Sequence, residues 1–116
     1  MKRAREPCKG KWSLAGGFGA FEKEKNPVKA INIEIKDDFG VDFDGKFYDI
    51  SYEEQSEPMI KLFFIGKLKG KPRIISKETT SEIKWVSLNE ALKIDLAFND
   101  KDILKKLDRK NKIQSH

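Results

Sequence analysis

The apolar residues of this chain fall in short blocks whose spacing predicts helices and strands. One stripe recurs at steps of three and four residues, at Val28, Ile31, Ile35 and Phe39. That period predicts a helix over residues 27–39 with one buried face. Asn26 is a favourable N-cap, Pro27 suits the first helical position, and Gly40 suits the C-terminal end. This segment carries the clearest helical pattern in the chain.

The segments after this helix predict strands. Residues 43–52 partly alternate between apolar and polar side chains, around a turn that we expect at Asp44 and Gly45. Residues 59–68 are rich in apolar and aromatic side chains and predict a central strand. Residues 83–86 predict a further short strand.

Two helices are predicted near the C-terminal end. Ser87 and Glu90 have the spacing of a capping box, which opens a short helix through Leu92. A final helix begins at Asn99 or Asp100. Its buried side is expected to hold Ile103, Leu104 and Leu107.

A chain of 116 residues suits one domain with its own core and is too short for two. We therefore expect one domain over residues 1–116, with a polar, frayed tail after about residue 110. The mixture of helices and strands predicts an α/β fold with a mixed sheet between helices.

Two residue counts narrow the chemistry. Cys8 is the one cysteine and His116 the one histidine, which excludes internal disulfides, Cys/His zinc sites and histidine-based catalytic triads within one chain. No apolar run approaches the roughly 20 residues of a membrane span, and the N-terminal segment lacks the apolar core of a signal peptide. We therefore expect a cytoplasmic protein with no membrane partner.

The charge balance is basic, with 24 Lys and Arg against 19 Asp and Glu, a net charge of +5. Such a surface suits anionic partners, either nucleic acid or small phosphorylated molecules, and also serves solubility alone. The lysine-rich final helix lacks interleaved aromatic residues, so a nucleic-acid partner is not expected.

Three carboxylates stand out on the first predicted helix. Glu34, Asp37 and Asp38 lie at i, i+3 and i+4 and therefore share one face. Clustered like charges destabilise a helix unless a hard cation such as Mg²⁺ or Mn²⁺ neutralises them. The alternative is an ordinary solvated acidic face with Lys29 and Lys36 as counterions. Spacing alone favours this alternative.

The context of these carboxylates resembles the Nudix hydrolase family, whose box reads G-x5-E-x7-R-E-U-x-E-E-x-G-U, with U a bulky aliphatic residue. Residues 33–41 (IEIKDDFGV) match the second half of the box in register. Residues 10–18 (GKWSLAGGF) resemble the approach to the box, and residues 82–86 (EIKWV) resemble the strand before the final helices. Residues 96–100 (LAFND) resemble a segment of ADP-ribose-type members. The resemblance covers residues 3–107.

The chain also departs from the family pattern. The substituted positions are Ile33 in place of arginine, Asp37 and Asp38 in place of glutamates, and Ala15 in place of proline. The spacing before the matched half is about two residues long, so either Glu22 or Glu24 fills the first glutamate of the box. Residues 2–5 resemble the end of a family strand. We expect the first part of this strand and its hairpin partner to be missing, through truncation or because the sheet is completed otherwise.

The resemblance implies a metal site and a substrate site. As metal ligands it implies Glu34, Asp37 and Asp38, with Glu34 nearest the attacking water and Mg²⁺ or Mn²⁺ as the cofactor. Glu78 or Glu82 would supply the base or ligand that the family places in a later loop. The expected substrate contacts are Gly16, Gly17 and Phe18, of which the glycines allow the backbone to approach a pyrophosphate.

The implied activity is metal-dependent hydrolysis of a nucleoside diphosphate linked to a sugar or second nucleotide, rather than of a free triphosphate. The alternative is a catalytically degenerate Nudix module that binds a nucleotide or protein partner without turnover. The substitutions in the box favour the alternative, and the retained carboxylates favour the enzyme. The expected partners are a nucleotide-type small molecule and, in a homodimer, a second copy of the chain.

Overall fold

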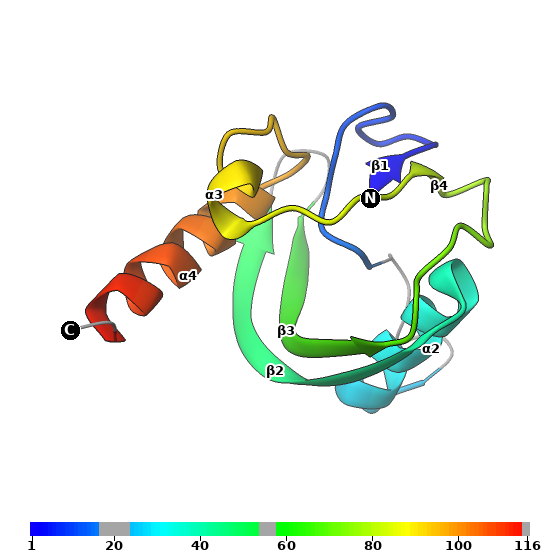
Figure 1. The fold of residues 1–116 in the computed structure, drawn as a ribbon, viewed down its shortest axis with the longest axis horizontal. Helices are drawn as coiled ribbons and strands as arrows, with labels where there is room; N and C mark the ends of the chain where they lie inside the picture. The colour runs from blue at the N-terminus through cyan, green and yellow to red at the C-terminus, as the bar shows by residue number, and fades with distance from the viewer. Residues whose placement is uncertain (17–23, 54–57, 115–116) are drawn as a thin grey trace.

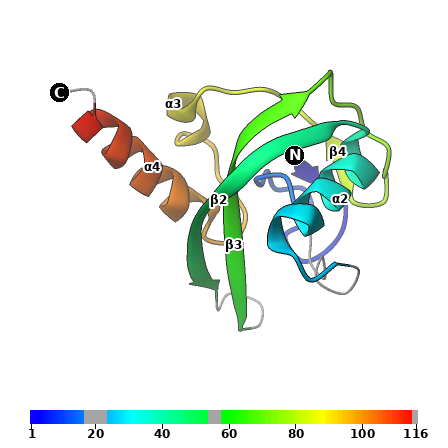
Figure 2. The same cartoon turned by 90° about the horizontal axis from the view of Figure 1, so that it is seen from below.

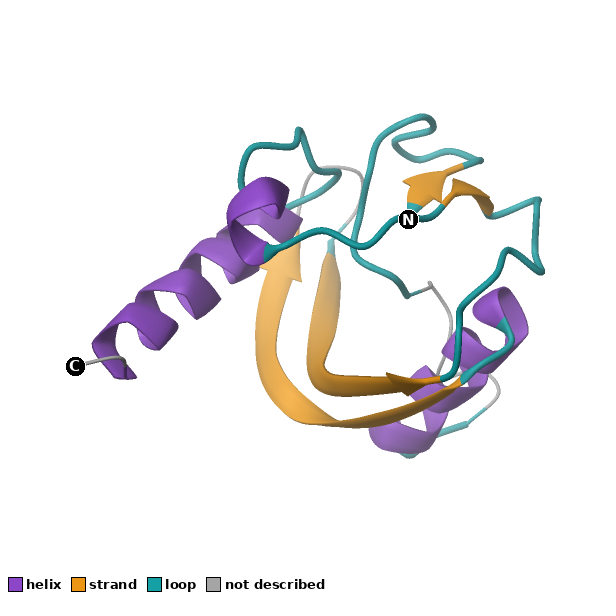
Figure 3. Cartoon of the chain, in the orientation of Figure 1, coloured by secondary structure: helices purple, strands orange, loops and turns teal. Residues whose placement is uncertain are grey.

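The computed structural model describes residues 1–16, 24–53 and 58–114, and every structural statement below refers to these residues. Figures 1 and 3 show an α/β arrangement, which confirms the expected fold class. In chain order, the elements are β1 (Lys2–Arg3), α2 (Pro27–Phe39), β2 (Asp42–Glu53), β3 (Met59–Lys69), β4 (Thr80–Glu82), α3 (Leu88–Ala91) and α4 (Asp100–Gln114).

The main feature of the fold is a long antiparallel ribbon made of β2 and β3. The expected turn at Asp44 and Gly45 is wrong, because β2 continues through both residues. Gly45 lies opposite Gly66, and a Cβ atom on Gly66 would overlap the carbonyl oxygen of Asp44. The glycines therefore allow the two strands to approach closely, and close approach of another backbone is a common reason for glycine within a strand. Within the described residues β3 pairs with β2 alone, so it is not the central strand that its composition predicted.

The ribbon bends sharply, as Figure 1 shows. The strand register shifts between Phe47 and Asp49, which leaves Tyr48 as an extra residue on β2. A β-bulge of this kind bends a strand and increases its twist. Two separate hydrophobic clusters pack against the ribbon, one near its Asp42–Lys69 end and one at the bulge, and Figure 2 shows α2 and α4 on opposite sides of the ribbon.

The first cluster lies between α2 and the near end of the ribbon. Its buried members are Ile35, Phe39 and Val41, and its partly buried members include Ile31, Phe43 and Leu68. The expected helix over residues 27–39 is confirmed, with the Asn26 side chain accepting hydrogen bonds from the backbone N–H groups of Val28 and Lys29. Ile35 is buried as expected, whereas Ile31 is only partly buried because it lies beside a cavity.

The second cluster joins the two C-terminal helices to the middle of the ribbon, at Tyr48 and Phe63 beside the bulge. Ala91, Ile103 and Leu104 are buried there, while Leu107 is only partly buried. Ser87 caps α3 as expected, since its Oγ accepts a hydrogen bond from the Glu90 backbone N–H at 3.1 Å, and the Ser87 hydroxyl donates to the Glu90 carboxylate. Helix α4 continues beyond residue 110 to Gln114, so the expected fraying does not begin there.

The short strand predicted at residues 83–86 is wrong, because β4 lies earlier, at Thr80–Glu82, and pairs with β1. Ile83 packs against the first cluster and Val86 against the second. The apolar side chains in this segment therefore connect the two clusters without pairing in a sheet. Among the described residues, no helix has both the length and the apolar character needed to cross a membrane.

Gly40 provides a direct test of how α2 ends. Its φ of 72° lies in the left-handed region, and an added Cβ atom would lie 2.7 Å from Ile75 Cδ1. We expect Gly40→Ala to lower the free energy of unfolding, measured in urea, by about 1–2 kcal/mol. Gly10→Ala is the control, because Gly10 has a φ of 85° with open space around its Cβ position. A smaller loss at Gly40 than at Gly10 would contradict the expected crowding.

Candidate functional site

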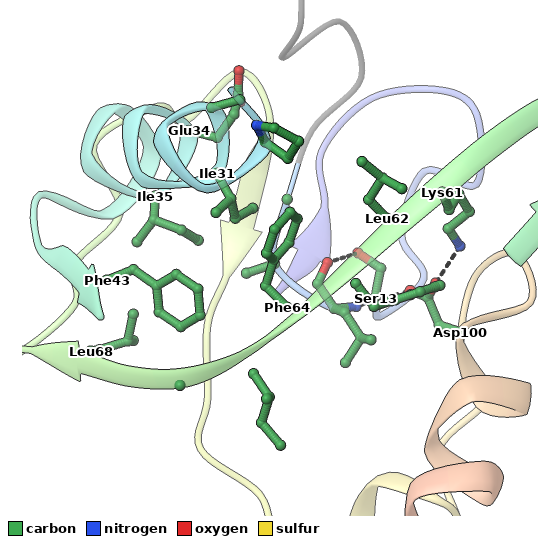
Figure 4. A pocket seen from close by; sticks show the side chains of 18 of the residues that line it. Ser13, Ile31, Glu34, Ile35, Phe43, Lys61, Leu62, Phe64, Leu68 and Asp100 are labelled. Carbon is green, nitrogen blue, oxygen red and sulfur yellow. Dashed lines mark hydrogen bonds and ion pairs between the residues drawn. The ribbon is translucent and has the colours of Figure 1, made fainter. Parts of the chain in front are cut away.

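A cavity of about 1030 Å³ lies between α2, β3 and the segment of residues 13–16. Figure 4 shows Ile31 from α2 and Phe64 from β3 pointing toward one another across this space, with Phe43 and Leu68 farther along the ribbon. Most of the lining is apolar. Among its polar and charged residues are Arg3, Ser13, Glu34, Lys61 and Asp100. The volume is at the upper end of the usual range for ligand pockets, and the lining resembles theirs.

A second, smaller cavity of about 40 Å³ lies beside the small sheet of β1 and β4. Glu34 and Asp38, one helical turn apart on α2, both line it. Arg3, Arg5 and Gly16 contribute to the same wall. Arg3, Gly16 and Glu34 also line the large cavity, so the two spaces meet at these residues.

The small cavity places buried groups of opposite charge in one wall. Asp38 is 8% exposed and Arg3 is 7% exposed. Burial lowers the pKa of the Arg3 guanidinium from its ordinary value, although an arginine remains protonated at neutral pH. Arg3 Nε donates a hydrogen bond to the Pro7 carbonyl oxygen at 2.6 Å, and its guanidinium lies 5.1 Å from the centre of the Phe98 ring. These contacts hold a positive charge beside two carboxylates.

The structure brings together three of the residues singled out in the sequence: Gly16, Glu34 and Asp38. Asp37 is exposed and lines neither cavity. Glu78 and Glu82 are also exposed and line neither cavity, and Glu82 forms an ion pair with Lys2 at 3.9 Å.

The remaining candidates divide into two groups. Gly17, Phe18 and Glu22 lie outside the described residues. Glu24 is described, and its Oε1 atom accepts a hydrogen bond from the Asn26 backbone N–H at 3.1 Å. Glu24 therefore supports the start of α2 in this structure.

The donor set can be compared with the requirements of a divalent cation. Within the described part of the chain, no group of three or more Asp, Glu, His or Cys side chains converges on one point. Glu34 and Asp38 nevertheless supply two carboxylates to one small cavity. Mg²⁺ is usually held by one or two carboxylates, several waters and substrate phosphates, so this pair fits its needs.

Several residues in the cavity wall were not identified from the sequence as site residues. Lys61 interrupts an apolar strand and carries an ammonium group into the cavity wall, while Asp100 was interpreted only as a helix cap. Phe98 adopts a φ of 55°, an uncommon backbone conformation for a bulky residue. A lysine within an apolar run is a sequence signal that could have identified Lys61 as a site residue. No sequence signal could have shown that Lys61 pairs with Asp100, which lies 39 residues away.

Three comparisons show which known proteins the chain is similar to. A family model described as the NUDIX domain matches residues 1–107. A curated protein from Acinetobacter baylyi, the "ADPR responsive transcriptional repressor NtrR", is 27% identical over 110 residues. This match covers 90% of the chain and 43% of the repressor, so the chain spans less than half the length of that relative. A crystal structure of a MutT NUDIX hydrolase from Burkholderia pseudomallei superposes with a TM-score of 0.71 at 19% identity, covering 90% of this chain and 83% of that one.

Proposed function

The chain belongs to the Nudix family, and we propose on that premise that it hydrolyses a nucleoside diphosphate linked to a second moiety with the help of a divalent cation. The observation that carries the proposal is the placement of Glu34 and Asp38 beside Arg3, where a small charged cavity meets a large apolar one. This arrangement suits a ligand with a charged diphosphate at one end and a flat, largely apolar group at the other.

The carboxylates of α2 and Arg3 have separate roles in the proposed reaction. Glu34 and Asp38 would hold Mg²⁺ or Mn²⁺, with Asp37 adding negative charge from the exposed side of the same helix. The guanidinium of Arg3 would bind phosphate oxygens, since its planar group matches their geometry. When bound, the cation would screen phosphate charge and activate a water. Glu78 and Glu82 lie outside both cavities, so the proposal assigns them no catalytic role.

A second candidate function is nucleotide binding without turnover. One observation favours it in particular: the curated relative is described as an ADPR-responsive repressor. The substitutions in the box agree with this function, since Ile33 replaces an arginine and the aspartate side chains are one methylene shorter than glutamate. A ligand displaced by about 1 Å can reduce a reaction rate by about a hundredfold.

One experiment tests the hydrolase proposal and separates it from the second candidate. The protein is incubated with Mg²⁺ or Mn²⁺ and with ADP-ribose, NADH, a diadenosine polyphosphate or 8-oxo-dGTP. Phosphate is assayed after phosphatase treatment for the first three compounds, and after inorganic pyrophosphatase treatment for the triphosphate, which a phosphatase would cleave directly. We expect phosphate release from ADP-ribose to be faster than from any deoxynucleoside triphosphate. A ligand-induced rise in melting temperature without phosphate release would establish the binding function instead. If no compound releases phosphate and none raises the melting temperature, both functions are excluded for these compounds.

A further inference from the structure

A buried charged pair lies across the large cavity from the α2 carboxylates. Lys61 Nζ, on β3, donates a hydrogen bond to Asp100 Oδ1 at 2.6 Å, and Figure 4 shows the pair on the side of the cavity away from Glu34. Their side chains are only 18% and 5% exposed. Removing two charges from water is costly and is often not repaid in stability, so a buried pair of this kind calls for a specific explanation.

The second oxygen of Asp100 indicates what the pair does. Asp100 Oδ2 accepts a hydrogen bond at 3.0 Å from the backbone N–H of Leu14, a residue 86 positions away in the sequence. Leu14 comes two residues before Gly16, which lines both cavities. The carboxylate therefore anchors the segment that carries the glycine past Glu34.

Neighbouring contacts hold Asp100 itself in place. Lys61 Nζ also donates to Asn99 Oδ1 at 2.9 Å, and the Asn99 backbone N–H donates to Glu53 Oε2 at 2.8 Å. The preceding residue, Phe98, has the left-handed φ of 55°, and Lys61 Nζ lies 5.2 Å from the centre of its ring. A strained backbone of this kind persists only where its surroundings fix it firmly, and such strain concentrates at functional sites.

We propose that Lys61 and Asp100 form a positioning pair that holds the Leu14–Gly16 segment in the geometry needed for ligand binding at the cavity. The pair acts through the Leu14 backbone, and its effect on ligand binding rests on the proposed function above. Lys61 compensates the buried carboxylate, and the carboxylate fixes the Leu14 N–H. A neutral amide at position 100 would retain an acceptor for that N–H but lose the ion pair.

The structure offers a control ion pair with the same kinds of partner but greater exposure, 59% for the Lys106 side chain and 22% for that of Asp49. Asp49 Oδ2 lies 2.6 Å from Lys106 Nζ, and Asp49 Oδ1 accepts a hydrogen bond from the Ile50 backbone N–H at 2.8 Å. This carboxylate has the same two kinds of partner as Asp100, yet neither Asp49 nor Lys106 lines a cavity. Asp49→Asn therefore measures the cost of losing such a pair away from the site.

The test compares Asp100→Asn with Asp49→Asn in two measurements on the whole chain. Amide hydrogen exchange of Leu14, Ala15 and Gly16 is followed without ligand, and the dissociation constant for ADP-ribose is measured by calorimetry with Mg²⁺. For Asp100→Asn we expect at least tenfold faster exchange at these amides and at least tenfold weaker binding. For Asp49→Asn we expect both quantities to stay within twofold of wild type.

The lysine provides a second pair of variants. We expect Lys61→Met to behave like Asp100→Asn and Lys61→Arg, which keeps the charge, to restore binding to within threefold. Exchange at Leu14–Gly16 equal to that of wild type in Asp100→Asn would overturn the positioning role, as would equal effects of the Asp100 and Asp49 variants. Failure of the wild-type protein to bind ADP-ribose would count against the proposed function, while the exchange measurements would still decide whether the pair holds the segment.

Discussion

Glu34→Gln combined with Asp38→Asn is expected to abolish the rise in melting temperature that Mg²⁺ or Mn²⁺ causes in the wild-type protein. A ligand that binds the native state stabilises it by mass action, by about 2.7 kcal/mol at a concentration one hundred times its dissociation constant. For a domain of this size that corresponds to about 10 °C. The two substitutions keep the shapes of the side chains and remove both charges from the cavity that Glu34 and Asp38 line. Thermal unfolding with and without metal measures the effect.

The same double variant is expected to lose at least a hundredfold in the rate of ADP-ribose hydrolysis if the wild type is an enzyme. The matched control is Asp95→Asn combined with Asp102→Asn, which removes two exposed carboxylates that line neither cavity. The single variant Asp37→Asn tests whether the exposed third carboxylate contributes to the metal response and to the rate of hydrolysis. A metal response in the double variant equal to that of wild type would place the cation elsewhere in the protein.

Phe39→Ala is expected to cause the largest loss of stability among single substitutions in the first cluster. Phe39 is 3% exposed and packs with Ile35 and Val41 beneath the ribbon. Replacing a buried phenylalanine with alanine costs about 3–5 kcal/mol, through lost burial and the remaining cavity. That is a large share of the 5–15 kcal/mol that typically stabilises a domain, so much of the variant should be unfolded at 37 °C. Urea unfolding followed by circular dichroism gives the free energy.

Two further variants provide comparisons for the loss of stability in Phe39→Ala. Val28→Ala lies on the same helix at a position that is 38% exposed, and it should cost less than about 1 kcal/mol. Phe39→Leu retains most of the apolar volume and should fall between the two. Equal losses for Phe39→Ala and Val28→Ala would show that the first cluster does not carry the stability of this end of the ribbon.

The expectations that succeeded depend on local physics. The sequence predicts helix α2 with its observed bounds because its cap, its proline and its apolar stripe all act within about one or two turns. The helix cap at Ser87 was predicted correctly for the same reason. Helical periodicity also explains why Glu34 and Asp38 lie on one side of α2, because residues four apart share a face.

The expectations that failed required knowledge of distant partners. Asp44 and Gly45 have the composition of a turn, but the close approach of Gly66 from the other strand uses the glycine differently. The apolar residues at 83–86 have the composition of a strand, yet they pack against the two clusters while the strand forms at Thr80–Glu82. In both cases tertiary packing overrode a local preference, which is common for short segments with weak intrinsic propensity.

The amino-acid sequence by itself therefore determined the family resemblance, the α/β class, helix α2 and the helical face that carries Glu34 and Asp38. Helix α2 and its carboxylate face depend on spacings shorter than a helix, and the resemblance and the fold class depend on the order of short motifs and elements along the chain. The tertiary structure alone decided which of the candidate carboxylates reach a cavity, that Arg3 joins them, and that Lys61 and Asp100 meet at 2.6 Å. Both groupings bring together residues that lie tens of positions apart in the sequence, so no local pattern of spacing predicts them.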